Sequence, residues 1–67
     1  MNRERIKDRY QRTLGFIETQ SNGKQRALDA KGRTLGFFDP HQDTTKDAAH
    51  RTIAHGNVLA SLIYDVN

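Results

Sequence analysis

The chain has 67 residues, of which 34% are apolar and 28% charged, with 11 Lys and Arg against 8 Asp and Glu, a net charge of +3 and no cysteine. This length leaves room for one domain, residues 1–67, and the lack of thiols excludes disulfides, Cys-ligated zinc and a Cys nucleophile. No apolar stretch could span a bilayer, and the charged residues 1–5 lack the apolar run of a secretory signal. We therefore expect a small basic protein of the cytoplasm that does not contact membranes. Because so short a chain builds only a small core, self-association is also expected.

A short motif occurs three times along the chain. Residues 8–17 (DRYQRTLGFI) match residues 29–38 (DAKGRTLGFF), and residues 47–55 (DAAHRTIAH) form a weaker third copy. In the shared pattern Asp-x-x-Gly-Arg-Thr-Leu-Gly-Phe, Asp can accept backbone N–H bonds in a turn and Gly supplies a left-handed residue. Each copy therefore predicts the tip of a β-hairpin and its returning strand. Gln11 and His50 replace that Gly in the outer copies, and they must adopt the left-handed conformation at some cost or change the loop.

Turn signals between the copies separate six expected strands. Asn22-Gly23 is a hairpin signal, and Pro40 stops a central strand. Tight connections in sequence order predict a mainly β fold, an antiparallel meander. A charged helix over residues 3–12 is the alternative at the N-terminus, and the repeat favours a hairpin there. The expected strands are residues 4–8, 12–19, 24–29, 33–39, 43–47 and 51–55, in hairpin repeats over 4–19, 24–38 and 43–55.

The side-chain alternation of a strand assigns residues to faces. Leu14 and Phe16 should share one face, and so should Leu35 and Phe37 in the second copy. We expect this face to form the core. The opposite face should be solvated, with partial cover near two large apolar residues. Its expected members are Thr13, Thr34, Thr52, Gly15 and Gly36, and the two large residues are Ile17 and Phe38. The residues expected across from Leu14 and Leu35 are Ile6 and Ala27.

The C-terminal segment predicts a short helix over residues 57–65. Asn57 is a suitable N-cap after Gly56. Apolar residues follow at a spacing that gives one helical stripe. Such a helix is too short to persist alone, so it should dock on the apolar face of the sheet or on a partner. A short strand is the other possibility for this segment. The stripe, which is also the candidate surface for a partner, consists of Val58, Leu59, Leu62, Ile63 and Val66.

Arg12, Arg33 and Arg51 occupy equivalent positions in the three copies. Stacked hairpins would place them in a row with a spacing of about 9–10 Å. With Lys31, this row is a candidate surface for nucleic acid. The simpler and favoured interpretation is that each arginine pairs with the aspartate opening its own turn, because acidic and basic residues alternate along the chain. Those aspartates are Asp8, Asp29 and Asp47.

The residue types used in catalysis and metal binding are present without a supporting arrangement. His41, His50 and His55 have no Cys beside them and no ligand spacing. The carboxylates of the loop opened by Pro40 lack a partner for acid–base chemistry, and the serines lack a His and Asp to activate them. We therefore expect no enzymatic activity, no metal, no cofactor and no small-molecule substrate.

The repeated Asp-x-x-Gly-Arg-x-Leu-Gly, followed by Gly-Asn-Val-Leu-Ala-Ser-Leu-Ile at residues 56–63, resembles a group of short uncharacterised bacterial proteins. These carry hairpin repeats ending in a Gly-Asn-x-Leu segment, and some occur in mobile or conjugative elements. The resemblance covers residues 6–63 and implies a fold; it transfers no functional residue. The function expected from the sequence is a non-enzymatic interaction module that binds a protein partner or itself. Nucleic-acid binding through Arg12, Arg33 and Arg51 is the alternative.

Overall fold

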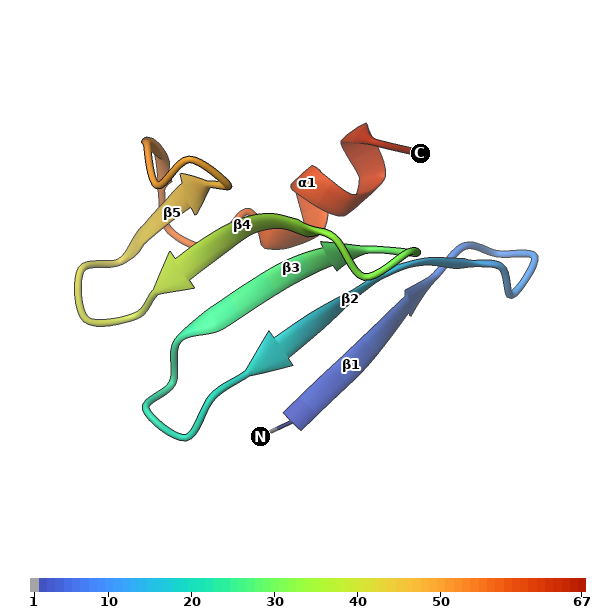
Figure 1. The fold of residues 1–67 in the computed structure, drawn as a ribbon, viewed down its shortest axis with the longest axis horizontal. Helices are drawn as coiled ribbons and strands as arrows, with labels where there is room; N and C mark the ends of the chain where they lie inside the picture. Colours follow the sequence, from blue (N-terminus) through green and yellow to red (C-terminus); the bar gives the residue numbers. More distant parts are fainter. Residues whose placement is uncertain (1) are drawn as a thin grey trace.

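The computed structural model describes residues 2–67 as one six-stranded antiparallel sheet and one helix. The strands lie in sequence order, and each is joined to the next by a tight turn (Figure 1). This confirms the predicted mainly β meander with a short C-terminal helix. The elements are β1 (Asn2–Lys7), β2 (Thr13–Thr19), β3 (Gln25–Asp29), β4 (Thr34–Asp39), β5 (Thr44–Asp47), β6 (Thr52–His55) and α1 (Leu59–Asp65).

The N-terminal segment forms a strand. β1 pairs with β2 along its whole length, from Asn2 opposite Thr19 to Lys7 opposite Thr13. The hairpin interpretation is therefore confirmed, and the charged helix considered for residues 3–12 is absent from the part of the chain that the structure describes. The repeat was the better guide because its turn residues fix the chain reversal, whereas the charges of this segment fit either structure.

The three repeated turns share one hydrogen-bond pattern. In the middle copy, one Asp29 carboxylate oxygen accepts the N–H groups of Lys31 at 2.9 Å and Arg33 at 2.8 Å. Gly32 is left-handed, with φ of 86°, and its N–H donates to the Asp29 carbonyl. Gln11 and His50 adopt the same conformation, with φ of 69° and 65°. The predicted left-handed position is therefore confirmed in all three copies, and in the outer two it carries a steric cost.

Each returning strand begins with a β-bulge. The register shifts between Ile6 and Lys7, between Ala27 and Leu28, and between Thr45 and Lys46. The partner strand holds one extra residue at each shift, and a bulge of this kind interrupts the strict alternation of faces. The extra residues are Leu14, Leu35 and Ile53. Past the bulge, the residues paired with Ile6 and Ala27 are Gly15 and Gly36.

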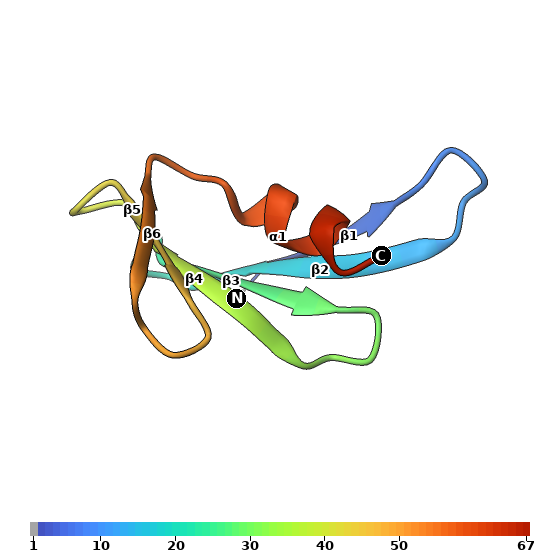
Figure 2. The same ribbon diagram turned by 90° about the horizontal axis from the view of Figure 1, so that it is seen from above.

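Helix α1 packs on the face that carries these glycines (Figure 2). A Cβ added to Gly36 would lie 2.5 Å from Leu62 Cδ1, and one added to Gly15 would lie 2.9 Å from Ile63 Cγ2. The prediction that this face is solvated and that Phe16 and Phe37 lie in the core is therefore wrong. The bulge explains the error, because it brings the leucine toward the helix while Phe16 and Phe37 face away. The predicted docking of the helix on its own sheet is confirmed.

The core is small and centred on β3. Ala27, Leu59 and Ile63 are fully buried, so both sheet and helix contribute to it. The helix begins at Leu59, later than predicted, and its N-cap is Val58. Asn57 still contributes, because its Oδ1 accepts the Leu59 N–H at 3.1 Å. Partly buried side chains surround the core: Ile6, Leu14, Ile17, Leu35, Phe38 and Leu62.

The segment between β6 and α1 is attached to the sheet through Thr45. The buried Thr45 hydroxyl donates to the Gly56 carbonyl at 2.6 Å and accepts the Val58 N–H at 3.1 Å. Asn57 adds a 2.7 Å hydrogen bond from its amide to the Gln25 side chain. These contacts determine where the chain leaves the sheet and returns over it as a helix.

Candidate functional site

The sheet face opposite α1, called the open face below, carries a row of polar and aromatic side chains. Neighbours in a strand point to opposite faces, and Ile17, Ala27 and Gly36 mark the helix side. The residues next to them in sequence therefore lie on the open face, except the bulge residue Leu35, which packs on the core. The strand register aligns five of them across the sheet: Arg3, Glu18, Arg26, Phe37 and Lys46.

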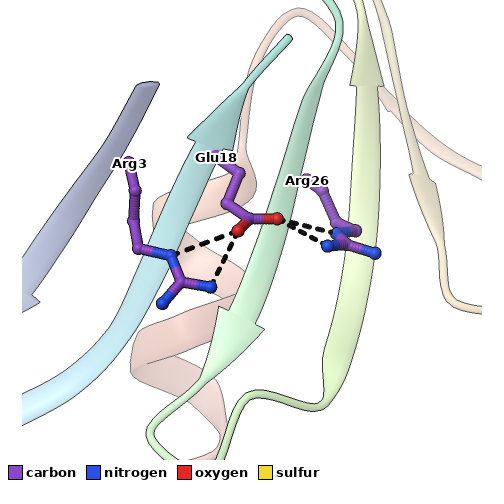
Figure 3. A network of polar contacts seen from close by, with 3 residues as sticks. All are labelled: Arg3, Glu18 and Arg26. Carbon is purple, nitrogen blue, oxygen red and sulfur yellow. Dashed lines mark hydrogen bonds and ion pairs between the residues drawn. The ribbon is translucent and has the colours of Figure 1, made fainter. Parts of the chain in front are cut away.

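Glu18 holds two of these arginines in fixed positions (Figure 3). Its Oε2 accepts bonds from Arg3 Nε at 3.1 Å and Nη2 at 2.8 Å. Its Oε1 accepts bonds from Arg26 Nε at 3.2 Å and Nη2 at 2.5 Å. The hydrogen bonds from Arg26, and then those from Arg3, hold the pKa of Glu18 below its usual value, so the carboxylate is charged at neutral pH. One negative charge therefore orients two guanidinium groups, and the cluster has a net charge of +1.

Two aromatic rings flank this cluster. The Arg3 guanidinium lies 4.8 Å from the centre of the Phe16 ring. The Phe37 ring stacks on His50, with 4.6 Å between the centres and 8° between the planes. Beside this stack is a hollow of about 160 Å³ whose lining includes Lys24 and Lys46. The open face thus places cationic groups next to flat aromatic surfaces.

The three arginines of the repeat lie in the turns, each paired with its own aspartate. The distances from arginine Nε to carboxylate are 2.8 Å for Arg12, 2.8 Å for Arg33 and 3.0 Å for Arg51. The favoured interpretation of these residues is therefore confirmed. The partners are Asp8, Asp29 and Asp47.

Backbone N–H groups hold these turn carboxylates in the charged form. In each turn the pKa of the aspartate is lowered, first by the hydrogen bond from the arginine N–H and further by the arginine side chain. Each pair has no net charge, which weakens the attraction of the row for a polyanion. Lys31 is exposed and lines a hollow of about 520 Å³ with Arg33 and Val66. Nucleic-acid binding by this row stays a prediction.

The apolar stripe of the C-terminal segment is divided between core and surface. Leu59 and Ile63 are fully buried against the sheet, and Leu62 packs on the same core. Val58 is half-buried, whereas Val66 is 57% exposed. The contact of this stripe with a partner stays a prediction, and Val66 is its most accessible member.

Metal-binding and membrane-spanning features can be examined over residues 2–67. In that range no three His, Asp or Glu side chains lie close enough together to hold a metal ion. Of the three histidines, His50 is engaged with Phe37 as described above. No helix in the same range has the length and apolar character needed to cross a membrane.

Comparisons with protein-family models, with curated proteins and with solved structures found no match to this chain. The candidate site is therefore defined by the geometry of this structure alone. Sequence reasoning missed the open face, although a signal for it exists: Arg3, Arg5 and Lys7 alternate with Asn2, Glu4 and Ile6. That alternation places every cation of β1 on one side of the sheet.

Proposed function

We propose that the protein is a small non-enzymatic interaction module that binds a protein partner, or a second copy of itself, along strand β6. The observation that supports this is the environment of Ile53. It occupies the bulge position of the third copy, where Leu14 and Leu35 pack on the core in the first two. Ile53 is 46% exposed, because the helix covers β2 to β4 and does not reach it.

Strand β6 is also an edge of the sheet. The equivalent strands β2 and β4 each pair with a following strand, and β6 has no following strand within residues 2–67. An edge strand with an exposed apolar residue can accept a strand from another chain. Only Thr52–His55 offer this edge, so the contact is short and its affinity is modest.

Light scattering after size exclusion, over micromolar to millimolar concentrations, tests self-association. Ile53→Lys places a charge on the edge and should abolish any concentration-dependent increase in mass. Tyr10→Lys is the matched control, since it changes an exposed aromatic residue in the turn between β1 and β2, at the opposite edge of the sheet and outside both candidate partner surfaces. A monomer at every concentration would remove the self-association branch.

The heterologous branch is tested with the same variants as baits in a cell lysate. A genuine β6 partner is retained by wild type and by Tyr10→Lys and lost by Ile53→Lys. A protein retained equally by all three baits does not use this edge. If no protein separates the baits and the chain stays monomeric, the proposal fails.

A further inference from the structure

The basic residues of the chain are concentrated on the open face. Six of the 11 Lys and Arg residues lie there by strand alternation and register. They come from β1, from β3 and the residue just before it, and from β5, so they extend across the sheet. They are Arg3, Arg5, Lys7, Lys24, Arg26 and Lys46.

Few carboxylates share this face. By the same alternation only Glu18 and Asp39 lie on it, which gives six positive charges against two negative, or +4. The rest of the chain holds five basic and six acidic residues, or −1, which together restore the total of +3. The charges that alternate along the sequence are therefore separated in space, and such a surface attracts polyanions.

The arginines of the Glu18 cluster keep donors for a ligand. Glu18 engages Nε and Nη2 of both Arg3 and Arg26. The Nη1 atoms of these arginines make no hydrogen bond with residues 2–67. Their side chains are 54% and 39% exposed. Because the carboxylate fixes the planes of the two guanidinium groups, less side-chain entropy is lost when they bind a phosphate.

The aromatic rings decide which polyanion fits. Phe16 on β2 and Phe37 on β4 lie on the same face, two strands apart and offset by two residues along β3, so their Cα atoms are about 12 Å apart. Bases of a single strand stack on such rings while nearby cations contact the phosphates. A duplex keeps its bases stacked on one another, and an acidic protein or an anionic membrane would use the cations alone.

We propose that the open face binds single-stranded nucleic acid, with the cations contacting phosphates and the Arg3–Phe16 and His50–Phe37 stacks providing the flat surfaces on which bases lie. The hollow beside Phe37 and His50, whose lining carries Lys24 and Lys46 against the single carboxylate of Asp39, is the position for one base. The surface borders β6 through Lys46 and His50, but it uses side chains of the sheet face and not the free backbone edge of β6, so it does not depend on the function proposed above.

Fluorescence anisotropy with labelled single strands of about twelve nucleotides tests the proposal, since this length matches the site size of small sheet-based binders. DNA and RNA strands form separate arms, and a duplex of the same sequence and heparin serve as competitors. Binding should weaken as salt is raised, because counterions are released from the strand. The single strand should compete better than the duplex.

Two double variants locate the surface. Arg5→Gln with Lys46→Gln removes two open-face cations that form no ion pair within residues 2–67. Affinity should fall about tenfold or more, and the slope of log K against log salt should decrease by about 1.4. Arg9→Gln with Lys31→Gln removes the same charge from exposed turn residues and should change affinity by less than about threefold. Equal losses in both variants would place the binding elsewhere.

Phe37→Leu tests the stacking. It keeps an apolar side chain, and affinity for the single strand should fall about fivefold or more with the salt slope unchanged. Heparin binding should not change. Circular dichroism and the proton–nitrogen NMR spectrum show whether each variant is folded, and chemical-shift changes in wild type on titration map the surface independently. No binding at low salt, shifts confined to the turns, or duplex and heparin bound as well as the single strand would overturn the proposal.

Discussion

The two faces of the sheet are built from alternate residues of the same strands, and they differ in chemistry. Under α1 the strands present Gly15, Ala27 and Gly36, which let the helix approach closely. On the other side the same strands present Phe16, Arg26 and other cationic or aromatic side chains. We infer that the helix side serves folding, and binding is proposed for the other side. Substitution of open-face cations that form no ion pair, such as Arg5 and Lys46, should therefore alter ligand affinity and leave stability nearly unchanged.

The largest expected effect is on the helix side. Ile63→Ala leaves a cavity in a core of only three fully buried apolar residues, and the free energy of unfolding should fall by about 3 kcal/mol. Arg5→Gln on the open face should stay within about 0.5 kcal/mol of wild type. Urea unfolding followed by circular dichroism measures both. Similar losses in the two variants would contradict the separation of roles.

Gly36→Ala should have the next largest effect. Its Cβ would lie 2.5 Å from both Leu62 Cδ1 and the Lys46 carbonyl oxygen, and the latter cannot move without distorting the sheet. Overpacking of this kind should lower the free energy of unfolding by about 2 kcal/mol. Gly32→Asn is the matched control. Gly32 is left-handed and has open space around it, and Asn tolerates that conformation. Thermal unfolding of both variants tests the glycine face.

Acid should destabilise the fold through carboxylates of the turns and of the open face. The pKa values of Asp8, Asp29, Asp47 and Glu18 are lowered in the folded chain from ordinary values of 3.8 for Asp and 4.5 for Glu. A lowered pKa contributes stability that is fully present above the ordinary value. That stability is lost as the pH falls through the folded-state value.

The unfolding free energy should therefore be level near neutral pH and decline below about pH 4.5. Urea titrations at a series of pH values measure the decline. Glu18→Gln should have a smaller decline than wild type, because the variant lacks one of the four groups. An unchanged profile would mean that Glu18 is not stabilised by its two arginines.

The smallest expected effect on stability comes from the left-handed residues of the two outer turns. Gln11→Gly removes the steric cost of a left-handed residue and should raise the free energy of unfolding by about 0.5 kcal/mol. His50→Gly removes the same strain but also the ring stacked on Phe37, so its gain should be smaller. Paired melting curves measure the difference. A larger gain for His50→Gly would show that the stack contributes little to stability.

Local signals made much of the fold predictable. The Asp-x-x-Gly-Arg turns, the Asn22-Gly23 turn and the helical stripe all act within a few residues, and each formed the expected element. The face of the core was not predictable in this way. A bulge at Leu14 or Leu35 is a property of two paired strands, and it changes the face of a residue without any mark in either strand alone.

The candidate site was harder to predict for the same reason. Glu18 contacts Arg3 and Arg26 only after three strands are placed in register, and they are far apart in the chain. The arginines of the repeat were predicted to form a row because they recur at equivalent positions. Their spacing from Asp lets each one pair with the aspartate of its own turn. The alternation that places Arg3 and Arg5 on one face was the signal for this site in the sequence. It indicates an exposed cationic surface only once the helix is known to cover the other face.

The position of α1 in the chain has a consequence for synthesis. All six strands precede the helix, and each pairs only with its sequence neighbours, so hairpins can form as they leave the ribosome. The apolar face of a sheet must be buried against another element of the fold. Leu59 and Ile63, which complete the core, emerge after all six strands. Cooperative folding therefore waits until the helix has left the ribosome, and a nascent chain arrested before residue 59 should remain sensitive to protease.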